Sequence, residues 1–199
     1  MPVYKEGLDA VIKPTVMSLK AAISTYEMQG GTANIFVNDD GMQLIAKADA
    51  DARREFYREH NIGWVARPAH SPKPEFGKNL FLRRGKFKKA SNMNYALRTS
   101  NLVEEKLATI VRGEAWSEED EMNAYYQSLS DVVEGDEGRT WAEGFIRIGD
   151  YILIIDSDTR IPADCLLDAA SEMEYSPEVA IIQFSSGVMN VTISFFEKG

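Results

Sequence analysis

The sequence predicts an α/β protein in which a mostly parallel sheet is flanked by helices. Short apolar runs of strand length alternate with amphipathic stretches of helix length, which is the order typical of this class. Two of the apolar runs end in acidic residues, as expected where parallel strands deliver side chains to a ligand-binding edge. With 199 residues, 44% of them hydrophobic, the chain is long enough to bury the core of one domain.

The first half of the chain contains four predicted elements. Residues 33–39 predict a buried strand, because the run is short, contains β-branched and aromatic residues, and ends in a polar turn. Residues 46–60 predict a helix and residues 63–66 a second strand. A loop with three prolines follows over 67–77, and residues 88–100 predict a helix with small and apolar side chains on one face.

The second half is predicted to return to the same rhythm after an acidic stretch. Residues 151–155 (YILII) predict a strand that runs straight into an Asp-Ser-Asp sequence. Pro162 suits the first turn of a helix that continues to residue 175, and residues 179–184 predict a further strand. Residues 104–143 show weak patterning, so we expect a surface insertion that is partly helical around 118–130 and partly disordered.

Charge is distributed unevenly along the chain. The net charge of −9 equals that of residues 104–143, which hold twelve acids and three bases. The preceding stretch, 78–98, holds bases and no acid, which suits a ligand that bears phosphate. Its basic residues are Lys78, Arg83, Arg84, Lys86, Lys88, Lys89 and Arg98.

Several classes of protein are disfavoured by composition. No apolar run approaches the roughly 18 residues of a membrane span, and the N-terminal residues lack the pattern of a secretory signal. A single cysteine, Cys165, excludes an internal disulfide and a cysteine-rich metal site. The overall negative charge opposes a polyanion, so we expect no nucleic-acid partner. The chain by itself is predicted to be soluble and cytoplasmic.

Two acidic pairs are the candidate binding residues. Asp156 and Asp158 follow the predicted strand two residues apart, so an extended backbone would project both carboxylates to one side. Two such oxygen ligands suit a divalent cation that also contacts phosphates. Asp39 and Asp40 end the earlier strand in the same way. Each pair has a plain alternative, because aspartates also serve as solvated turn residues and helix caps.

Four motifs in this order resemble those of family-2 glycosyltransferases, in particular the cellulose, chitin and hyaluronan synthase-like superfamily. The opening Pro2-Val3-Tyr4-Lys5-Glu6 is similar to P-x-Y-x-E, and Asp39-Asp40-Gly41 to the D-D-G of that family. Residues 89–97 (KASNMNYAL) resemble K-A-G-N-L-N-x-A-L, the most specific match. Asp156-Ser157-Asp158 resembles the metal-binding D-x-D.

The resemblance implies a GT-A fold and inverting transfer from a UDP-sugar to a growing polysaccharide of the cell-wall type. It implies Tyr4 and Glu6 beside the uridine, Asp39 or Asp40 at the uracil or ribose, and Lys89 at the diphosphate. It also implies Asn92 and Asn94 near the donor and Arg67 at a phosphate or uracil. Asp156 and Asp158 would hold Mg²⁺ or Mn²⁺ against the diphosphate.

The chain also departs from that family. The T-E-D motif with its general base and the Q-x-x-R-W motif are absent from the sequence, so no catalytic residue is assigned. We therefore expect residues 1–199 to be a partial GT-A domain, truncated at both ends. The longer parent is expected at the cytosolic face of a membrane, which it would meet only through transmembrane segments missing here.

Two other classes of function stay open at this point. The chain is alternatively a catalytically inactive nucleotide-binding or protein-interaction module, whose acidic stretch recruits a basic partner. A nucleotidyltransferase of related architecture is a third reading, although the glycine-rich phosphate loop usual in such enzymes is absent.

Overall fold

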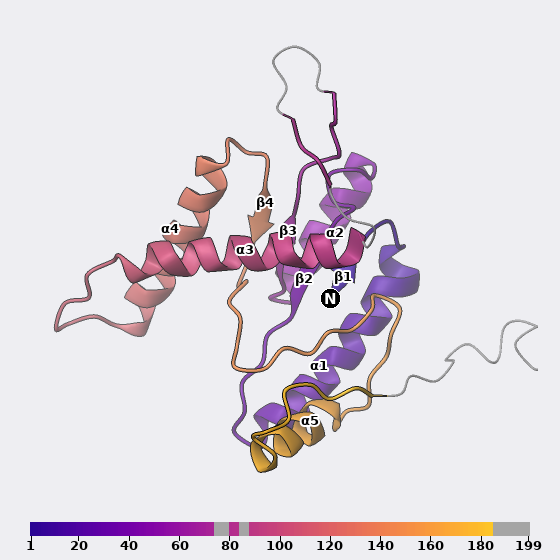
Figure 1. The fold of residues 1–199 in the computed structure, drawn as a ribbon, viewed down its shortest axis with the longest axis vertical. Coiled ribbons are helices and arrows are strands. Elements are labelled where there is room, and N and C mark those ends of the chain that lie inside the picture. The colour runs from indigo at the N-terminus through magenta and orange to yellow at the C-terminus, as the bar shows by residue number, and fades with distance from the viewer. Residues whose placement is uncertain (74–79, 84–87, 185–199) are drawn as a thin grey trace, which may run out of the picture.

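The computed structural model describes residues 1–73, 80–83 and 88–184, and it has a four-stranded sheet flanked by helices (Figure 1). The strands are β1 (Pro2–Val3), β2 (Phe36–Asp39), β3 (Gly63–Ala66) and β4 (Trp141–Glu143), and they lie in that order. Strands β1, β2 and β3 are parallel, and β4 runs antiparallel to β3. Among these residues, no helix is long and apolar enough to cross a membrane. The arrangement is the mixed α/β architecture predicted, consistent with a GT-A-like fold.

Two helices cover one face of the sheet. A π-helical turn η1 (Leu8–Ile12) leads into α1 (Lys13–Glu27), and α2 (Lys47–Glu59) connects β2 to β3. The side chains of Ile12, Val16, Val37, Phe56 and Trp64 meet in a buried cluster between these helices and the sheet, which we call the first core. Alternate strand residues face this side, because successive side chains of a strand point to opposite faces.

The opposite face of the sheet is covered by α3 (Lys88–Ala108) and α4 (Glu118–Gly135) (Figure 1). Val65 of β3 packs there with Val103, Leu107, Tyr125 and Leu129, the second core. A last helix, α5 (Cys165–Tyr175), contacts α1. The sheet therefore lies between two helical layers.

Most of the first-half predictions are confirmed. The strand predicted over 33–39 is present as β2, although it begins at Phe36, and the helix predicted over 46–60 is α2. Strand β3 occupies the predicted residues, and the helix predicted over 88–100 continues to Ala108. Helix α1 was not predicted. Three residues of the basic stretch, Lys78, Arg84 and Lys86, lie outside the described residues.

The strands predicted over 151–155 and 179–184 are wrong. Both segments lack regular structure in the described part of the chain. Residues 152–155 keep a period of two, with Ile155 7% exposed in the first core while Ile152 and Ile154 are 58% and 60% exposed. The residue pattern reports which side chains prefer burial, but a strand also needs a hydrogen-bonded neighbour, and no pairing is formed there among the described residues. The helix predicted after Pro162 is α5, which ends at Tyr175 as expected, but it begins at Cys165 after the N-cap Asp164, so Pro162 does not lie in its first turn.

The disorder predicted within residues 104–143 is also wrong. This stretch contains the end of α3, all of α4 and strand β4. Helix α4 begins at a capping box in which Ser117 and Asp120 satisfy each other's backbone N–H groups. The acids at residues 118–120 of its first turn are exposed, while Ala124, Tyr125 and Leu129 are buried in the second core. Few apolar residues at the correct spacing were enough to fix the helix.

Candidate functional site

Two of the four motifs, together with Arg67, meet at the carboxyl end of the parallel strands. Val3 pairs with Asp39 and Asn38 pairs with Val65. Tyr4, Asp40 and Arg67 therefore follow three neighbouring strands at one edge of the sheet. This edge is where open parallel sheets bind ligands.

Asp39 forms the buried base of this edge. Its side chain is fully buried and accepts hydrogen bonds from Arg53 Nη1 at 2.7 and 2.9 Å, from Tyr57 Oη at 2.9 Å and from the Gly41 N–H at 3.1 Å. Burial raises the pKa of Asp39, and Arg53 and Tyr57 oppose that rise. Burial, and then the charge of Asp39, raises the pKa of Tyr57 well above its ordinary value. These contacts occupy both carboxylate oxygens of Asp39.

Asp40 lies nearer the surface and is shared by two arginines. Arg67 Nε and Nη2 bind its two oxygens at 2.6 and 2.9 Å, and Arg83 Nη1 lies 3.1 Å from Oδ1. Arg67 is 2% exposed and also donates to the Ser91 hydroxyl at 2.9 Å. Arg83 donates further to the carbonyl oxygens of Pro68 and Asp40, and burial lowers its pKa while Asp40 raises it. Two guanidinium groups against one carboxylate leave this part of the edge positively charged.

The first motif passes directly over the Asp39-Asp40-Gly41 turn. A Cβ atom on Gly41 would lie 1.5 Å from the carbonyl oxygen of Tyr4, so only glycine fits beneath that backbone. Arg53 donates to the same carbonyl at 3.0 Å and to that of Glu6 at 2.6 Å. The Glu6 carboxylate accepts from the Tyr4 N–H at 2.6 Å, and the Tyr4 side chain stays exposed at the edge.

The first turn of α3 brings the third motif to the fourth. Lys89 Nζ contacts Asp156 Oδ1 at 2.6 Å, and both side chains are about half exposed, at 52% and 53%. Asn92 is buried and donates to the Asn38 carbonyl at the end of β2 at 2.8 Å, which fixes α3 to the sheet. Asn94 is exposed on α3. The structure thus brings Lys89 and Asp156 into contact and gives Asn92 a fixed place in the fold.

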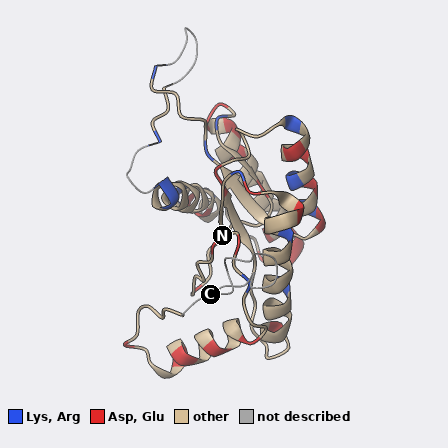
Figure 2. Ribbon diagram, turned by 90° about the vertical axis from the view of Figure 1, so that its right-hand side faces the viewer, with Lys and Arg blue, Asp and Glu red and all other residues tan. Residues whose placement is uncertain are grey.

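Asp156 and Asp158 lie in a tight turn rather than on extended backbone. The Thr159 N–H donates to the Asp156 carbonyl at 3.1 Å, which closes the D-x-D turn (residues 156–159). Asp156 and Asp158 are exposed, and Ser157 between them is 6% exposed. The two carboxylates therefore lie on the solvent side and the serine on the inner side, as expected, but a turn produces this arrangement and not an extended strand. The ribbon of α5, the lowest helix in Figure 2, is coloured for acidic residues and for no basic one. The cation that contacts Asp156 is Lys89 of α3.

The chemistry of these residues fits a divalent cation. Mg²⁺ is bound in such sites by one or two carboxylates and by substrate phosphates, with water completing the shell. Asp156 and Asp158 supply two carboxylates that solvent reaches. Among the described residues, no group of three or more acidic, histidine or cysteine side chains is arranged to hold a metal ion.

Arg53 and Arg83 help to build the site, and neither was assigned to it from the sequence. Arg83 belongs to the basic stretch, which was a usable signal. Arg53 lies within a helix rich in charged residues, and nothing in its neighbours distinguishes it from Arg54. Only the face of α2 that packs on the sheet sends Arg53 inward, where it is 2% exposed.

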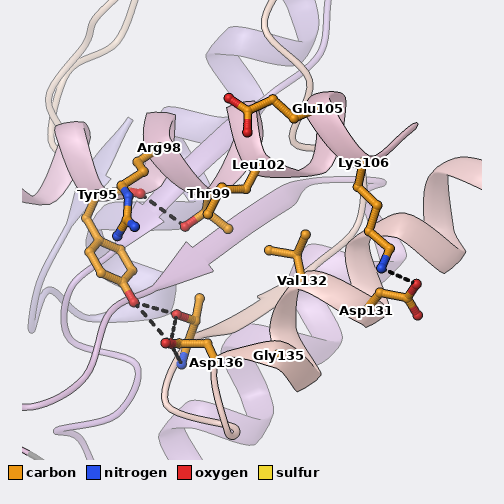
Figure 3. A pocket seen from close by; sticks show the side chains of 11 residues that line it. Tyr95, Arg98, Thr99, Leu102, Glu105, Lys106, Asp131, Val132, Gly135 and Asp136 are labelled. Carbon is orange, nitrogen blue, oxygen red and sulfur yellow. Dashed lines mark hydrogen bonds and ion pairs between the residues drawn. The ribbon is translucent and has the colours of Figure 1, made fainter. Parts of the chain in front are cut away.

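A cavity with a volume of about 550 Å³ lies away from this edge, between α3 and α4 (Figure 3). Tyr95 points toward Thr140 and Asp136, which are hydrogen-bonded to one another, and Lys106 pairs with Asp131. None of the candidate residues named above lines it. We place the functional site at the strand edge, where charged groups from several elements converge.

Comparison with known proteins links the end of the chain to one family. No curated protein and no solved structure matches the chain. Residues 151–199, which include Asp156 and Asp158, match the family described as glycosyl transferase family group 2, and this supports a glycosyltransferase role.

Proposed function

We propose that this chain binds the UDP-sugar donor and a divalent cation, Mg²⁺ or Mn²⁺, for inverting glycosyl transfer to a polysaccharide acceptor. The contact between Lys89 and Asp156 carries the proposal. It joins two motifs that are 67 residues apart in the chain, at the strand edge where ligands of such sheets bind. The assignment to the cellulose, chitin and hyaluronan synthase-like subgroup rests on the four motifs alone.

The start of α3 favours an anionic ligand. A helix N-terminus already carries a partial positive charge, so the lysines at positions 88 and 89 are unfavourably placed for the helix itself. A phosphate group would be attracted both by the N–H groups of this helix end and by the lysines. In the absence of ligand, Asp156 offsets part of this charge.

The diphosphate is the part of the donor that these groups would stabilise. Transfer of the sugar leaves negative charge on the departing UDP, and cationic groups fixed next to it lower the barrier. Lys89 would neutralise one such charge, and Asp156 and Asp158 would hold a cation that supplies Lewis-acid chemistry there. Lys89 would then leave Asp156 and contact the phosphates.

The nucleoside would occupy the end of the strand edge that lies away from Lys89 and Asp156. The ring of Tyr4 is 45% exposed there and offers a flat surface, with Glu6 beside it. Asp40 and Arg67 lie next to it; Asp40 is bound by Arg67 and Arg83 but reaches closer to solvent, at 7% exposed, than Asp39, which is fully buried beneath Arg53 and Tyr57. We therefore assign the base or ribose contact to Asp40 and a supporting role to Asp39. Asn94, exposed on α3, is assigned to the donor side with Asn92 behind it.

Isothermal titration calorimetry with UDP, with and without Mn²⁺, tests this proposal. We expect Mn²⁺ to tighten UDP binding in the wild-type chain, and Asp156→Ala and Asp158→Ala to abolish that gain. Lys89→Ala is expected to weaken binding about tenfold, since a charge-assisted hydrogen bond of about 1.5 kcal/mol corresponds to that factor. The matched controls are Lys47→Ala and Asp51→Ala, which remove the members of an exposed ion pair on α2.

Two results would count against the proposal. One is the absence of UDP binding by the wild-type chain at any Mn²⁺ concentration. The other is equal loss of binding in the α2 control variants and the site variants, which would indicate a general charge effect.

A further inference from the structure

The D-x-D turn (residues 156–159) is held by α1. The Thr15 hydroxyl donates to the Ser157 carbonyl oxygen at 2.6 Å, across 142 residues of chain. Thr15 is 1% exposed and Ser157 is 6% exposed, so this hydrogen bond is shielded from water. The carbonyl that it satisfies lies at the centre of the turn, between the two exposed carboxylates.

A second contact from the same helix holds the chain just after the turn. The Ser18 hydroxyl accepts from the Ile161 N–H at 3.3 Å and donates to the Thr15 carbonyl at 2.8 Å. Thr15 and Ser18 are three residues apart, so they share one face of α1. We call this pair the α1 clamp. Its two contacts bracket residues 158–160.

Apolar packing supports the same segment at both ends. Ile155, directly before the turn, is 7% exposed in the first core, and Ile161 packs against that core after the turn. The segment has no helix or strand of its own. Its position is therefore set by contacts with the first core and by the two hydroxyl groups of the α1 clamp.

We infer that Thr15 and Ser18 are positioning residues for the cation site, which they hold in place through the backbone of the D-x-D turn. This inference rests on the proposed function. Removing the Thr15 hydroxyl leaves a buried carbonyl without its donor, so the turn would move to recover a partner. Contacts behind metal ligands typically alter metal affinity by about 10- to 100-fold when they are lost.

Thr15→Val removes the donor and keeps the shape of the side chain, and Thr15→Ser restores the hydroxyl. Thr25→Val is the matched control, because Thr25 lies on the same helix and donates to the carbonyl four residues earlier at 3.2 Å, as Thr15 also does. We expect Thr15→Val to raise the Mn²⁺ concentration for half-maximal UDP binding about tenfold. UDP affinity without metal should stay unchanged, and Thr15→Ser and Thr25→Val should resemble the wild type.

Hydrogen exchange measured by mass spectrometry tests the α1 clamp without any ligand. Peptides that contain Thr159 and Ile161 should exchange about fivefold faster or more in Thr15→Val than in Thr25→Val. Unchanged exchange would overturn the α1 clamp itself. Faster exchange with an unchanged Mn²⁺ requirement would overturn its role at the cation site. A wild-type chain that binds no UDP with Mn²⁺ would instead refute the proposed function, and with it the role of the α1 clamp there.

Discussion

Replacing Arg53 by methionine tests how much the buried ion pair beneath the Asp39-Asp40-Gly41 turn contributes to stability. Arg53 and Asp39 have side chains 3% and 0% exposed, and the same guanidinium holds the Tyr4 and Glu6 carbonyl oxygens. Removing one partner of a buried pair costs about 3–5 kcal/mol, because the other charge stays buried and uncompensated. For a chain of this size we expect the melting temperature to fall by roughly 6–20 °C.

The neighbouring residue provides the control. Arg54 lies on the same helix and pairs with Glu143, but its side chain is 40% exposed and that of Glu143 is 35% exposed. Arg54→Met is expected to cost less than about 1 kcal/mol. Urea unfolding followed by tryptophan fluorescence, to which the buried Trp64 contributes, measures both variants. Equal destabilisation by the two substitutions would refute the importance assigned to the buried pair.

If Arg53→Met does not fold, the double variant with Asp39→Asn keeps the test open. It removes the uncompensated charge, so it should recover part of the lost stability. No recovery would show that the cost comes from the two carbonyl contacts and not from the charge of Asp39.

The remaining predictions concern a glycine and an acid. Gly41→Ala should destabilise the fold by about 3 kcal/mol or more in the same unfolding assay, because its new methyl group would overlap a backbone carbonyl oxygen. Gly135→Ala is the control and should not destabilise the fold in this way, because its methyl group would meet open space. Equal destabilisation by the two substitutions would argue against the close approach at Gly41. Hydrogen bonding to Arg112 lowers the pKa of Glu121 from 4.5 to about 2, so its contribution to stability is complete above pH 4.5 and is lost as the pH falls through 2. Titration by NMR should show this value, and Arg112→Ala should return it toward 4.5; an unchanged pKa in that variant would contradict the assigned cause.

The sequence predicted elements well where burial pattern and local signals agree. The apolar run that ends in Asp39 is β2, and the charged, alanine-rich stretch after it is α2. The pattern failed over 151–155, where the same apolar signal produced no paired strand, since pairing depends on a neighbour that local residues do not specify. It also missed α1, in which the buried Val16 and Leu19 alternate with Thr15 and Ser18, whose hydroxyl groups make long-range contacts.

Part of the candidate site could also be predicted from the sequence. Motif order was enough to expect convergence at one sheet edge, and the structure brings Lys89 to Asp156. The different surroundings of Asp39 and Asp40 were not predictable, because adjacent residues differ in burial only once the facing helix is placed. The contacts of Arg53 and Thr15 depend on the orientation of α2 and α1, which no short motif encodes.

The length of α3 ties the acidic region to the rest of the molecule. Its 21 residues span about 31 Å, with Lys89 in the first turn and Val103 and Leu107 toward the other end, packed among side chains of α4. Excising residues 104–143 would therefore remove the end of this helix, uncover the apolar side chains that remain and take away the edge strand β4. Residues 104–143 are therefore structurally part of the domain. Their outer face can vary in sequence, but their deletion would disturb the position of Lys89 at the other end of α3.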